Sequence, residues 1–393
     1  MTVFREGGIA KLDFEYVPPR LPHREEYVSQ ILGFLKKVMV DEPGSTSGRV
    51  LVVGRSGTGK TVTARRVGEE LLRVSSKGGV DVRCVHVNCR MVGSEFALIQ
   101  SILRASAPEL PLRGYSPLEL LNALRDYLED GDRYLLVVLD ELDYFVRVRG
   151  EDLLYEFTRV MDAKPGRQRM SFIFIARSEQ FIDELSPATL SRFRPQLRFR
   201  FKPYKAEELF DILSERVEEA FVDGAVSEEV VRFVAKNAAE FGYGDARYAI
   251  QLLLVAGLAA DRDGSREVLP EHVREAQEAT DPRVREEDIL TLSRDGKALL
   301  LALARTLMDR RDAAYVPLGE VLETYVLVCE EYGFRPVEKP VLRQLLRELE
   351  LTGLISYGEG ESVGIPGVKV GVLEKVVSSI LGGGGPAGQG GLG

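Results

Sequence analysis

Tryptophan is absent from this sequence, and cysteine and histidine occur only three times each. There is no run of about 18 apolar residues, so we expect no membrane-spanning helix. The first residues, MTVFREGGIAKLDFEY, lack the apolar core of a secretory signal peptide. The close pair Cys84 and Cys89 is interpreted as two buried small residues in a reducing cytoplasm. A metal site there would need further ligands, and only His86 lies near enough in sequence.

An excess of positive charge is also missing. The chain carries 52 Lys and Arg against 61 Asp and Glu, a net charge of −9 at pH 7. This balance argues against a protein whose whole surface is coated by nucleic acid, but it leaves room for a local basic face. The 393 residues, 45% hydrophobic and 29% charged, are enough for two or three soluble globular domains.

Residues 1–201 are predicted to form an α/β domain with a parallel sheet. Five short runs rich in branched residues alternate with helical patterns: RVLVVG (49–54), VRCVHVNC (82–89), YLLVVLDE (134–141), SFIFIA (171–176) and LRFRF (197–201). Short, continuously apolar strands of this kind are typical of a parallel sheet covered by helices on both faces. A helix is expected before the first strand, over REEYVSQILGFLKKVM (24–39).

The strand pattern stops after residue 201. Residues 202–284 contain helical stripes in KAEELFDILSERVEEAF, SEEVVRFVAKNAAEF and DARYAIQLLLVAGLAA, which predict a helical lid domain. Residues 285–380 suggest helices over 288–308, 317–332 and 338–352, followed by two strand-like pieces, LISYG and VKVGVLE. Three helices and a β-hairpin are the outline of a winged helix. The Gly-rich residues 381–393 are expected to be disordered.

The segment GRSGTGKT (54–61) has the spacing of a phosphate-binding loop between a strand and a helix. Glycines let successive backbone N–H groups turn toward phosphates, and the helix N-terminus adds its positive dipole end. We therefore expect Gly57, Thr58 and Gly59 to bind ATP or ADP. Lys60 is expected to reach the β- and γ-phosphates, and Thr61 to ligate Mg²⁺ through its hydroxyl.

The run LLVVLDELD ends a predicted strand in two carboxylates about 80 residues after this loop. Asp140 fits the acid that holds Mg²⁺, and Glu141 fits a base that orients the attacking water. The pair favours the additional-strand ATPases over GTPases. The next strand, SFIFIARSEQ, ends in Arg177 and Ser178, where such ATPases place a polar side chain near the γ-phosphate.

At this point the sequence resembles a known family, the archaeal origin-recognition and cell-division-control (Orc/Cdc) initiators. These are AAA+ ATPases related to the eukaryotic origin recognition complex. The matching pieces, spread over roughly residues 3–375, are LDFEYVPPRLPHREE, GRSGTGKT, NCR, LDELDYF, FKPYKAEELFDILSERVEEAF, GYGDARYAI and LLRELELTGLI. The resemblance implies a weak ATPase that uses hydrolysis as a switch on duplex origin DNA. It also implies the MCM helicase and other initiator subunits as partners, no membrane, and a place in the archaeal cytoplasm by the nucleoid.

The resemblance also implies roles for individual residues. Tyr204 and Arg216 would complete the nucleotide pocket, and Arg247 would reach the γ-phosphate from the lid. Arg192 occupies the position from which an arginine reaches a neighbouring subunit's site, although an ordinary surface arginine fits equally well. Residues 93–118 take the place of an insertion that touches the DNA minor groove, with Arg104 and Arg113 as candidates.

Two positions depart from the family pattern. Family members commonly have Asn where this chain has Arg177 and Ser178, so hydrolysis is expected to be weaker than usual. The wing turn GEGESVGIPGVKV has a single cation, Lys369, where relatives usually carry arginines that strengthen minor-groove binding.

The net charge of the last domain argues against DNA binding, whereas the pattern of its cations on one helix favours it. Residues 285–371 hold 11 Lys or Arg against 15 Asp or Glu, a net of −4. On EKPVLRQLLRELE, however, Lys339, Arg343 and Arg347 fall on one helical face opposite a leucine-rich face that includes Val341, a stripe that could enter a major groove. The main hypothesis is an ATP-controlled origin-binding initiator. The alternative is a nucleotide-loaded adaptor whose winged helix binds protein partners.

Overall fold

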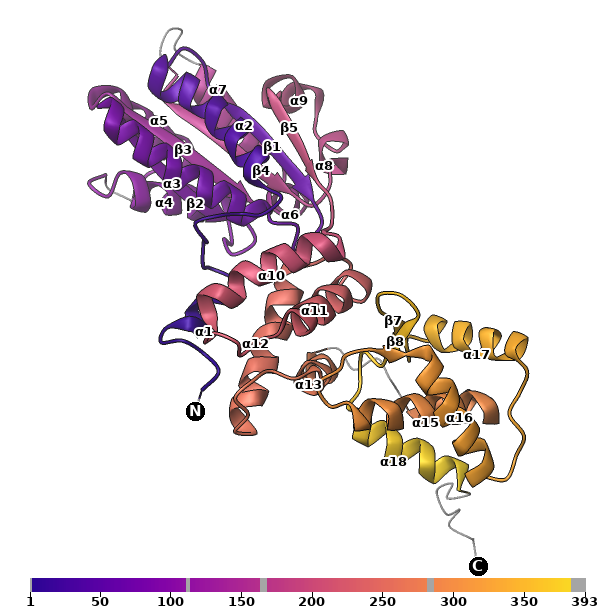
Figure 1. Cartoon of the computed structure of the whole chain (residues 1–393). Coiled ribbons are helices and arrows are strands. Elements are labelled where there is room, and N and C mark those ends of the chain that lie inside the picture. Colours follow the sequence, from indigo (N-terminus) through magenta and orange to yellow (C-terminus); the bar gives the residue numbers. More distant parts are fainter. Residues whose placement is uncertain (1, 111–113, 163–167, 281–285, 383–393) are drawn as a thin grey trace, which may run out of the picture. The chain divides into compact units, whose positions relative to one another are not determined.

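The computed structural model describes residues 2–110, 114–162, 168–280 and 286–382, and it divides into two compact units (Figure 1). One unit is Val17–Tyr204, and the other combines Met1–Tyr16 with Lys205–Gly393. Within the described ranges, no helix has the length and apolarity needed to cross a membrane.

The unit Val17–Tyr204 is built on a five-stranded sheet. The strands are β1 (Arg49–Gly54), β2 (Asp81–Asn88), β3 (Arg133–Asp140), β4 (Met170–Ala176) and β5 (Leu197–Phe201). They lie in the order β2-β3-β4-β1-β5, and every neighbouring pair is parallel. The predicted parallel α/β sheet is confirmed, and each strand begins within one residue of its expected position.

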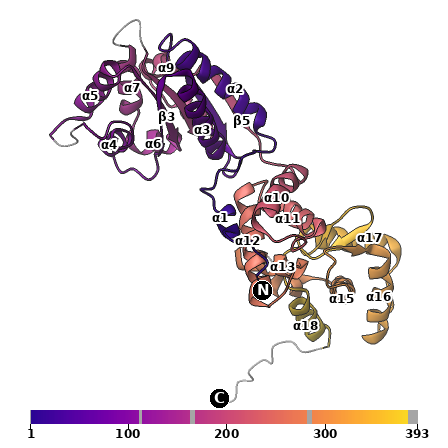
Figure 2. The same cartoon turned by 60° about the vertical axis from the view of Figure 1, so that its left-hand side comes forward.

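The inner strands β1, β3 and β4 are largely apolar because both faces of the sheet are buried there, whereas the edge strands β2 and β5 also carry exposed charged residues such as Asp81 and Arg198. In β1, Val50 and Val52 enter the core beneath α2 (Glu25–Lys36) and α3 (Lys60–Gly78). Leu51 and Val53 point to the opposite core. That second core is covered by α4 (Glu95–Ser106), α5 (Pro117–Asp130), α6 (Leu142–Arg149) and α7 (Asp152–Asp162), as Figure 2 shows. Because side chains alternate along a strand, one continuously apolar run serves both layers.

The second unit contains the lid. Its helices are α10 (Ala206–Ala220), α11 (Glu228–Glu240), α12 (Ala246–Arg262) and α13 (Pro270–Thr280). The segment before the first helix of the other unit packs here as well, including the short α1 (Gly8–Lys11). Phe4 lies against Phe221 with 4.7 Å between ring centroids, and the backbone N–H of Val3 donates to Asp261. Residues 2–16 therefore pack on the lid, although they were expected in the ATPase domain.

The winged helix follows the lid in the same unit. Its elements are α14 (Glu286–Thr291), α15 (Arg294–Asp309), β6 (Val316–Pro317), α16 (Leu318–Glu331), α17 (Lys339–Leu351), β7 (Ser356–Tyr357), β8 (Ser362–Gly364) and α18 (Val370–Leu381). The three strands pair antiparallel in the order β6-β8-β7. The predicted helical lid and winged helix are both present.

Two details of this domain were predicted wrongly. The expected helix over 288–308 is two helices, because Ser293 caps α15 by accepting a hydrogen bond from the N–H of Gly296 (3.1 Å). The piece VKVGVLE is the start of α18 and not a strand. The buried residues of α18 (Val370, Leu373 and Val377) have helical spacing, and this helix packs against α15. Tertiary burial therefore outweighs the strand preference of valine. We expected disorder from residue 381 onward, but Leu381 is the last residue of α18. Residues 383–393 lie outside the described part.

Candidate nucleotide site and DNA-binding surface

The phosphate-binding loop connects β1 to α3. Gly57 (φ 69°) and Gly59 (φ 87°) adopt left-handed backbone conformations that side chains rarely tolerate. A Cβ on Gly59 would lie 2.4 Å from the hydroxyl oxygen of Tyr204, so this tyrosine packs directly against the loop. Thr58 is buried and donates through its hydroxyl to the carbonyl of Arg55 (2.9 Å). Two left-handed glycines on either side of a buried threonine give the loop the curved form of a phosphate cradle.

Arg24 holds this loop in place, a role that the sequence did not reveal. Its guanidinium is buried and donates to the carbonyls of Thr58 (3.0 Å) and Lys202 (3.1 Å). It also stacks over the ring of Tyr204, 3.9 Å from the centroid. Arg24 thus ties the loop to the chain that leaves β5. A buried arginine of this kind has no local sequence signal, because its partners are backbone carbonyls far along the chain.

Lys60 and Thr61 begin α3 at the centre of the site. The Lys60 ammonium donates to the carbonyls of Gly54 (2.6 Å) and Arg55 (2.7 Å). The Thr61 hydroxyl donates to Oδ2 of Asp140 (2.6 Å), although 79 residues separate them in sequence. The fold therefore brings together the lysine, the hydroxyl and the carboxylate that the two motifs predicted.

Asp140 ends β3 in a buried, hydrogen-bonded position. Nε2 of His86, on β2, lies 3.3 Å from its Oδ2, and the N–H of Glu141 donates to its Oδ1 (2.9 Å). Burial alone would raise the pKa of Asp140, but the hydrogen bonds from His86 and Thr61 outweigh burial and hold that pKa below its usual value. The carboxylate is therefore ionised at neutral pH. A hydroxyl and an ionised carboxylate side by side are the hard oxygen ligands that Mg²⁺ takes.

Glu141 sits in a strained and strongly charged position. It adopts a left-handed conformation (φ 56°, ψ 39°) as the cap of α6. Its carboxylate lies 3.3 Å from the guanidinium of Arg177 and 3.6 Å from that of Arg90. The backbone N–H of Arg177 donates in turn to Asp143 (3.1 Å). Arg177 is therefore the polar residue of β4 that lies beside Glu141, whereas the Ser178 hydroxyl accepts from the N–H of Gln180.

Arg90 and His86 were not predicted as site residues, although the sheet order contains the signal. Asn88 of β2 is in register with Asp140 of β3. The residues that leave β2 must therefore lie beside those that leave β3, and the N–H of Cys89 donates to the carbonyl of Asp140 (2.8 Å).

Burial raises the pKa of the Cys84 thiol, on the same strand, to about 12, which keeps it unreactive.

Three other predicted residues lie away from this cluster or in the second unit. Arg192 ends α9 (Pro187–Phe193), with its guanidinium 5.4 Å from the ring of Tyr155. Arg216 of α10 is buried beside Tyr16 and pairs with Glu219 (3.3 Å), and burial lowers its pKa. The exposed Arg247 follows Asp245, which caps α12. Their catalytic or nucleotide-binding roles stay predictions.

The candidate DNA-binding stripe lies on α17. Lys339, Arg343 and Arg347 are all exposed, while Leu345, Leu346 and Leu349 are buried in the winged-helix core. Val341, which was expected on the apolar side, is 43% exposed. Among the residues that the structure describes, none forms an ion pair with the three cations of the stripe. They are therefore available to phosphates.

Three further DNA-binding candidates lie outside α17. Lys369 pairs with Glu275 of the lid (2.7 Å), so its charge is already balanced. Arg104 is exposed near the end of α4. Arg113 lies outside the described residues. These three stay predictions.

Three protein-family models match the chain in succession. An AAA domain matches residues 42–185, a Cdc6 AAA+ ATPase-type lid domain matches residues 210–278, and a CDC6 C-terminal winged helix domain matches residues 287–364. Together they follow the order of domains in the structure.

Similar proteins come from archaea. An ORC1-type DNA replication protein of Thermococcus onnurineus is 35% identical over 349 residues, which cover 88% of this chain and 82% of that protein. An ORC1-type DNA replication protein 2 of Saccharolobus solfataricus is 34% identical, over 88% of this chain and 84% of that protein. The crystal structure of Cdc6p from Pyrobaculum aerophilum is similar with a TM-score of 0.86 at 29% identity, covering 97% of this chain and 99% of that one. The Aeropyrum pernix ORC1 protein in complex with DNA has a TM-score of 0.62 at 30% identity, covering 94% and 96%.

Proposed function

The chain belongs to the ORC1-type family of DNA replication proteins, and on that premise we propose that ATP controls its binding to duplex DNA at a replication origin. It is an ATPase of the AAA+ class and a replication initiator. The proposal extends this to recruitment of the replicative MCM helicase, together with other initiator subunits. The similarity to an ORC1 protein solved in complex with DNA supports the DNA partner.

The nucleotide part of the proposal rests on the Thr61–Asp140 pair. Gly57, Thr58 and Gly59 would face the phosphates with their N–H groups, and Lys60 would add a positive charge. Thr61 and Asp140 supply the oxygen ligands for Mg²⁺, which neutralises phosphate charge when it is bound. The hydrogen bond between them (2.6 Å) supports this assignment, because both ligands already point to one place.

Hydrolysis is proposed to be slow because Glu141 is engaged by two arginines. A carboxylate that accepts a proton from water must be free to hydrogen-bond with that water. Here the ion pairs with Arg177 (3.3 Å) and Arg90 (3.6 Å) compete for the same oxygens. ATP binding then sets a long-lived state, and hydrolysis resets it. Purified protein would accordingly retain bound nucleotide.

The exposed cationic stripe of α17, which has no ion-pair partner among the described residues, is the single observation that carries the DNA-binding part. The winged helix as a whole is not basic, but three of its exposed cations lie together on one face of α17. Each phosphate contact contributes one released counterion to the salt dependence of binding. The stripe has the position and exposure of a helix that enters a major groove.

The test compares two double variants in duplex-binding titrations at several KCl concentrations. Arg343→Ala with Arg347→Ala should weaken binding and reduce the slope of log K against log[KCl] by about 2. The control, Arg310→Ala with Arg311→Ala, removes two exposed cations of the same domain from the loop after α15 and should keep most of the slope. Titrations with ATP, with ADP and with Lys60→Ala show whether nucleotide controls the affinity.

Two outcomes would overturn the proposal. Equal slopes for the two double variants would remove α17 from the DNA interface. If duplex affinity were also unchanged between ATP, ADP and Lys60→Ala, the adaptor hypothesis would be favoured. The exposed Leu327 of α16 and Leu351 of α17 would then be the surface to test for protein partners.

A further inference from the structure

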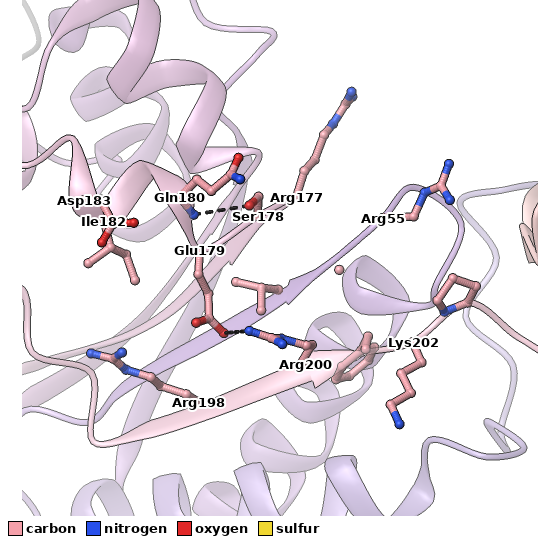
Figure 3. A pocket seen from close by; sticks show the side chains of 14 residues that line it. Arg55, Arg177, Ser178, Glu179, Gln180, Ile182, Asp183, Arg198, Arg200 and Lys202 are labelled. Carbon is pink, nitrogen blue, oxygen red and sulfur yellow. Dashed lines mark hydrogen bonds and ion pairs between the residues drawn. The ribbon is translucent and has the colours of Figure 1, made fainter.

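A second cationic feature lies on the ATPase domain, at the carboxyl ends of β1, β4 and β5. A cavity of about 530 Å³ opens there (Figure 3). Five cations line it: Arg55, Arg177, Arg198, Arg200 and Lys202. The two acids that line it are Glu179 and Asp183. A local surplus of positive charge in a chain of net charge −9 is unusual enough to require a reason.

The alternation of β5 produces most of this surplus. Leu197, Phe199 and Phe201 pack into the core shared with α2. Arg198 and Arg200 must therefore project from the opposite face, and Lys202 follows just after the strand; all three side chains are exposed. Figure 3 shows them one after another along one wall of the cavity. Successive members are two residues apart, which is about 6.6 Å in a strand.

Only part of this charge is balanced within the molecule. Arg200 pairs with Glu179 at 3.5 Å. Within the part of the chain that the structure describes, Arg198 and Lys202 have no ion-pair partner. Counting only partners in the described ranges, the row offers two cations without an ion pair and a third held by a weak, exposed pair.

The composition of the cavity favours a nucleic acid over a protein partner. A protein interface needs an apolar centre, but none of the exposed large apolar side chains of the described residues belongs to this lining. Charged residues on an edge strand also prevent strand pairing between molecules. That function does not account for Arg55, which follows the inner strand β1, while Arg177, which follows β4, is already paired with Glu141 (3.3 Å).

We propose that this cavity, the β5 groove, binds consecutive phosphates of a nucleic-acid strand and forms a DNA contact on the ATPase domain separate from α17. The inference rests on the proposed DNA-binding function and extends it to a second site. A row of cations at an even spacing matches a backbone of repeating phosphates and reads no base edges. The groove therefore adds affinity and salt dependence without sequence preference.

The experiment uses the full-length chain and measures binding against salt for one duplex and one single-stranded oligonucleotide. The groove variant is Arg198→Gln, Arg200→Gln and Lys202→Gln. The matched control is Lys37→Gln, Arg73→Gln and Lys77→Gln, which removes three exposed cations from the α2 and α3 side of the same domain. If each groove cation contacts one phosphate, the slope of log K against log[KCl] falls by about 2.7 on duplex or about 2.1 on single strands. The control should change it much less.

Glu179→Gln provides a test of opposite sign. It frees Arg200 without changing side-chain size, so nucleic-acid affinity should rise about two- to fivefold. Thermal midpoint and ATP affinity of all these variants should match the unaltered chain, because none of the changed side chains belongs to the nucleotide site.

Each possible result supports or overturns the β5 groove as a nucleic-acid site. A groove variant that keeps the slope of its control overturns the β5 groove, even if the α17 variants confirm the proposed function. A loss in the groove variant with no effect in α17 supports the groove and contradicts the role of α17. Displacement of the oligonucleotide by polyglutamate of equal charge and at equal concentration would show general anion binding and overturn the assignment to nucleic acid. Absence of any DNA binding overturns both proposals.

Discussion

The nucleotide site and helix α17 differ in whether their charged side chains are buried and paired within the protein. At the nucleotide site Lys60 and Asp140 are buried and already hold partners: Lys60 donates to two carbonyls and Asp140 accepts from Thr61. On α17 three cations stand exposed and without an ion pair among the described residues. A small polyanion is bound best by groups fixed in advance, whereas a long one can be bound by exposed cations that exchange water and counterions for phosphates.

The same contrast exists between two arginines of the second unit. Arg274 of α13 is fully buried and donates to the carbonyls of Ile365 (2.7 Å) and Ala314 (3.0 Å), which joins the lid to the winged helix. Arg343 is exposed on α17. The first arginine serves stability, and we assign the second to binding. Substitutions of buried and of exposed charged residues test this division between structural and binding roles.

The largest effect is expected for Arg274→Met. It removes three hydrogen bonds from a charged donor, two to buried carbonyls and one within the ion pair with Glu271 (3.1 Å), which should lower the free energy of unfolding by about 3–5 kcal/mol. Urea denaturation measures the change. Arg343→Met is the control and should stay within about 0.5 kcal/mol of the unaltered chain. Equal losses in the two variants would end the division between structural and binding arginines.

Lys60→Ala should weaken ATP binding about 100-fold. The substitution removes the ammonium group, so the complex with ATP loses one or two charge-assisted hydrogen bonds to phosphate, each worth about 1.5–3 kcal/mol. Calorimetric titration with ATP measures the affinity. Lys77→Ala, near the other end of α3, is the control and should bind ATP normally. A normal affinity for Lys60→Ala would show that the cradle is not the nucleotide site.

Arg177→Asn should increase the rate of ATP hydrolysis about fivefold. The change removes one of the two guanidinium groups that engage Glu141, so the carboxylate is more often free to hydrogen-bond with water. Steady-state phosphate release measures the rate. Arg147→Asn, an exposed arginine of α6, is the control. A rate that falls would instead give Arg177 a direct part in stabilising the reacting phosphate.

The smallest effect concerns Glu275, which links α13 to the winged helix. Hydrogen bonds from Arg262 and Lys369 lower its pKa from 4.5 to about 2. Because the folded pKa is depressed, the stabilisation is fully present above pH 4.5 and is lost as the pH falls toward 2. Glu275→Gln should therefore cost about 0.5–1 kcal/mol at pH 6 and much less at pH 3. A pH-independent difference in urea denaturation would contradict this pairing.

The strands, the phosphate-binding loop and the start of α12 depend on residues close together in sequence, so they could be predicted from it. The strands follow from continuous apolar runs, and the cradle follows from glycine spacing. The start of α12 follows from its cap Asp245, whose side chain accepts from the N–H groups of Arg247 and Tyr248. The failures are equally physical. Val370 and its neighbours have strand preference, but burial at helical spacing against α15 decides their structure.

Long-range partners could not be predicted in this way. Nothing near Glu141 in sequence indicates that Arg90 faces it, because the contact depends on β2 lying beside β3. Arg24 holds the loop through carbonyls, which every residue carries. Lys369 was expected to face DNA, but it is paired with Glu275 because the chain places the start of α18 beside α13.

The class of the fold, the order of the domains and the residues that can hold nucleotide could be predicted from the sequence, since each of these depends on spacing along the chain. Which charged groups are neutralised by partners inside the protein, and which stay exposed to a ligand, depends on the three-dimensional packing. A charge is neutralised by neighbours in space, and those neighbours are set by packing. That is why Arg274 joins two domains, Glu141 is restrained by two arginines, and α17 and the β5 groove keep their cations exposed.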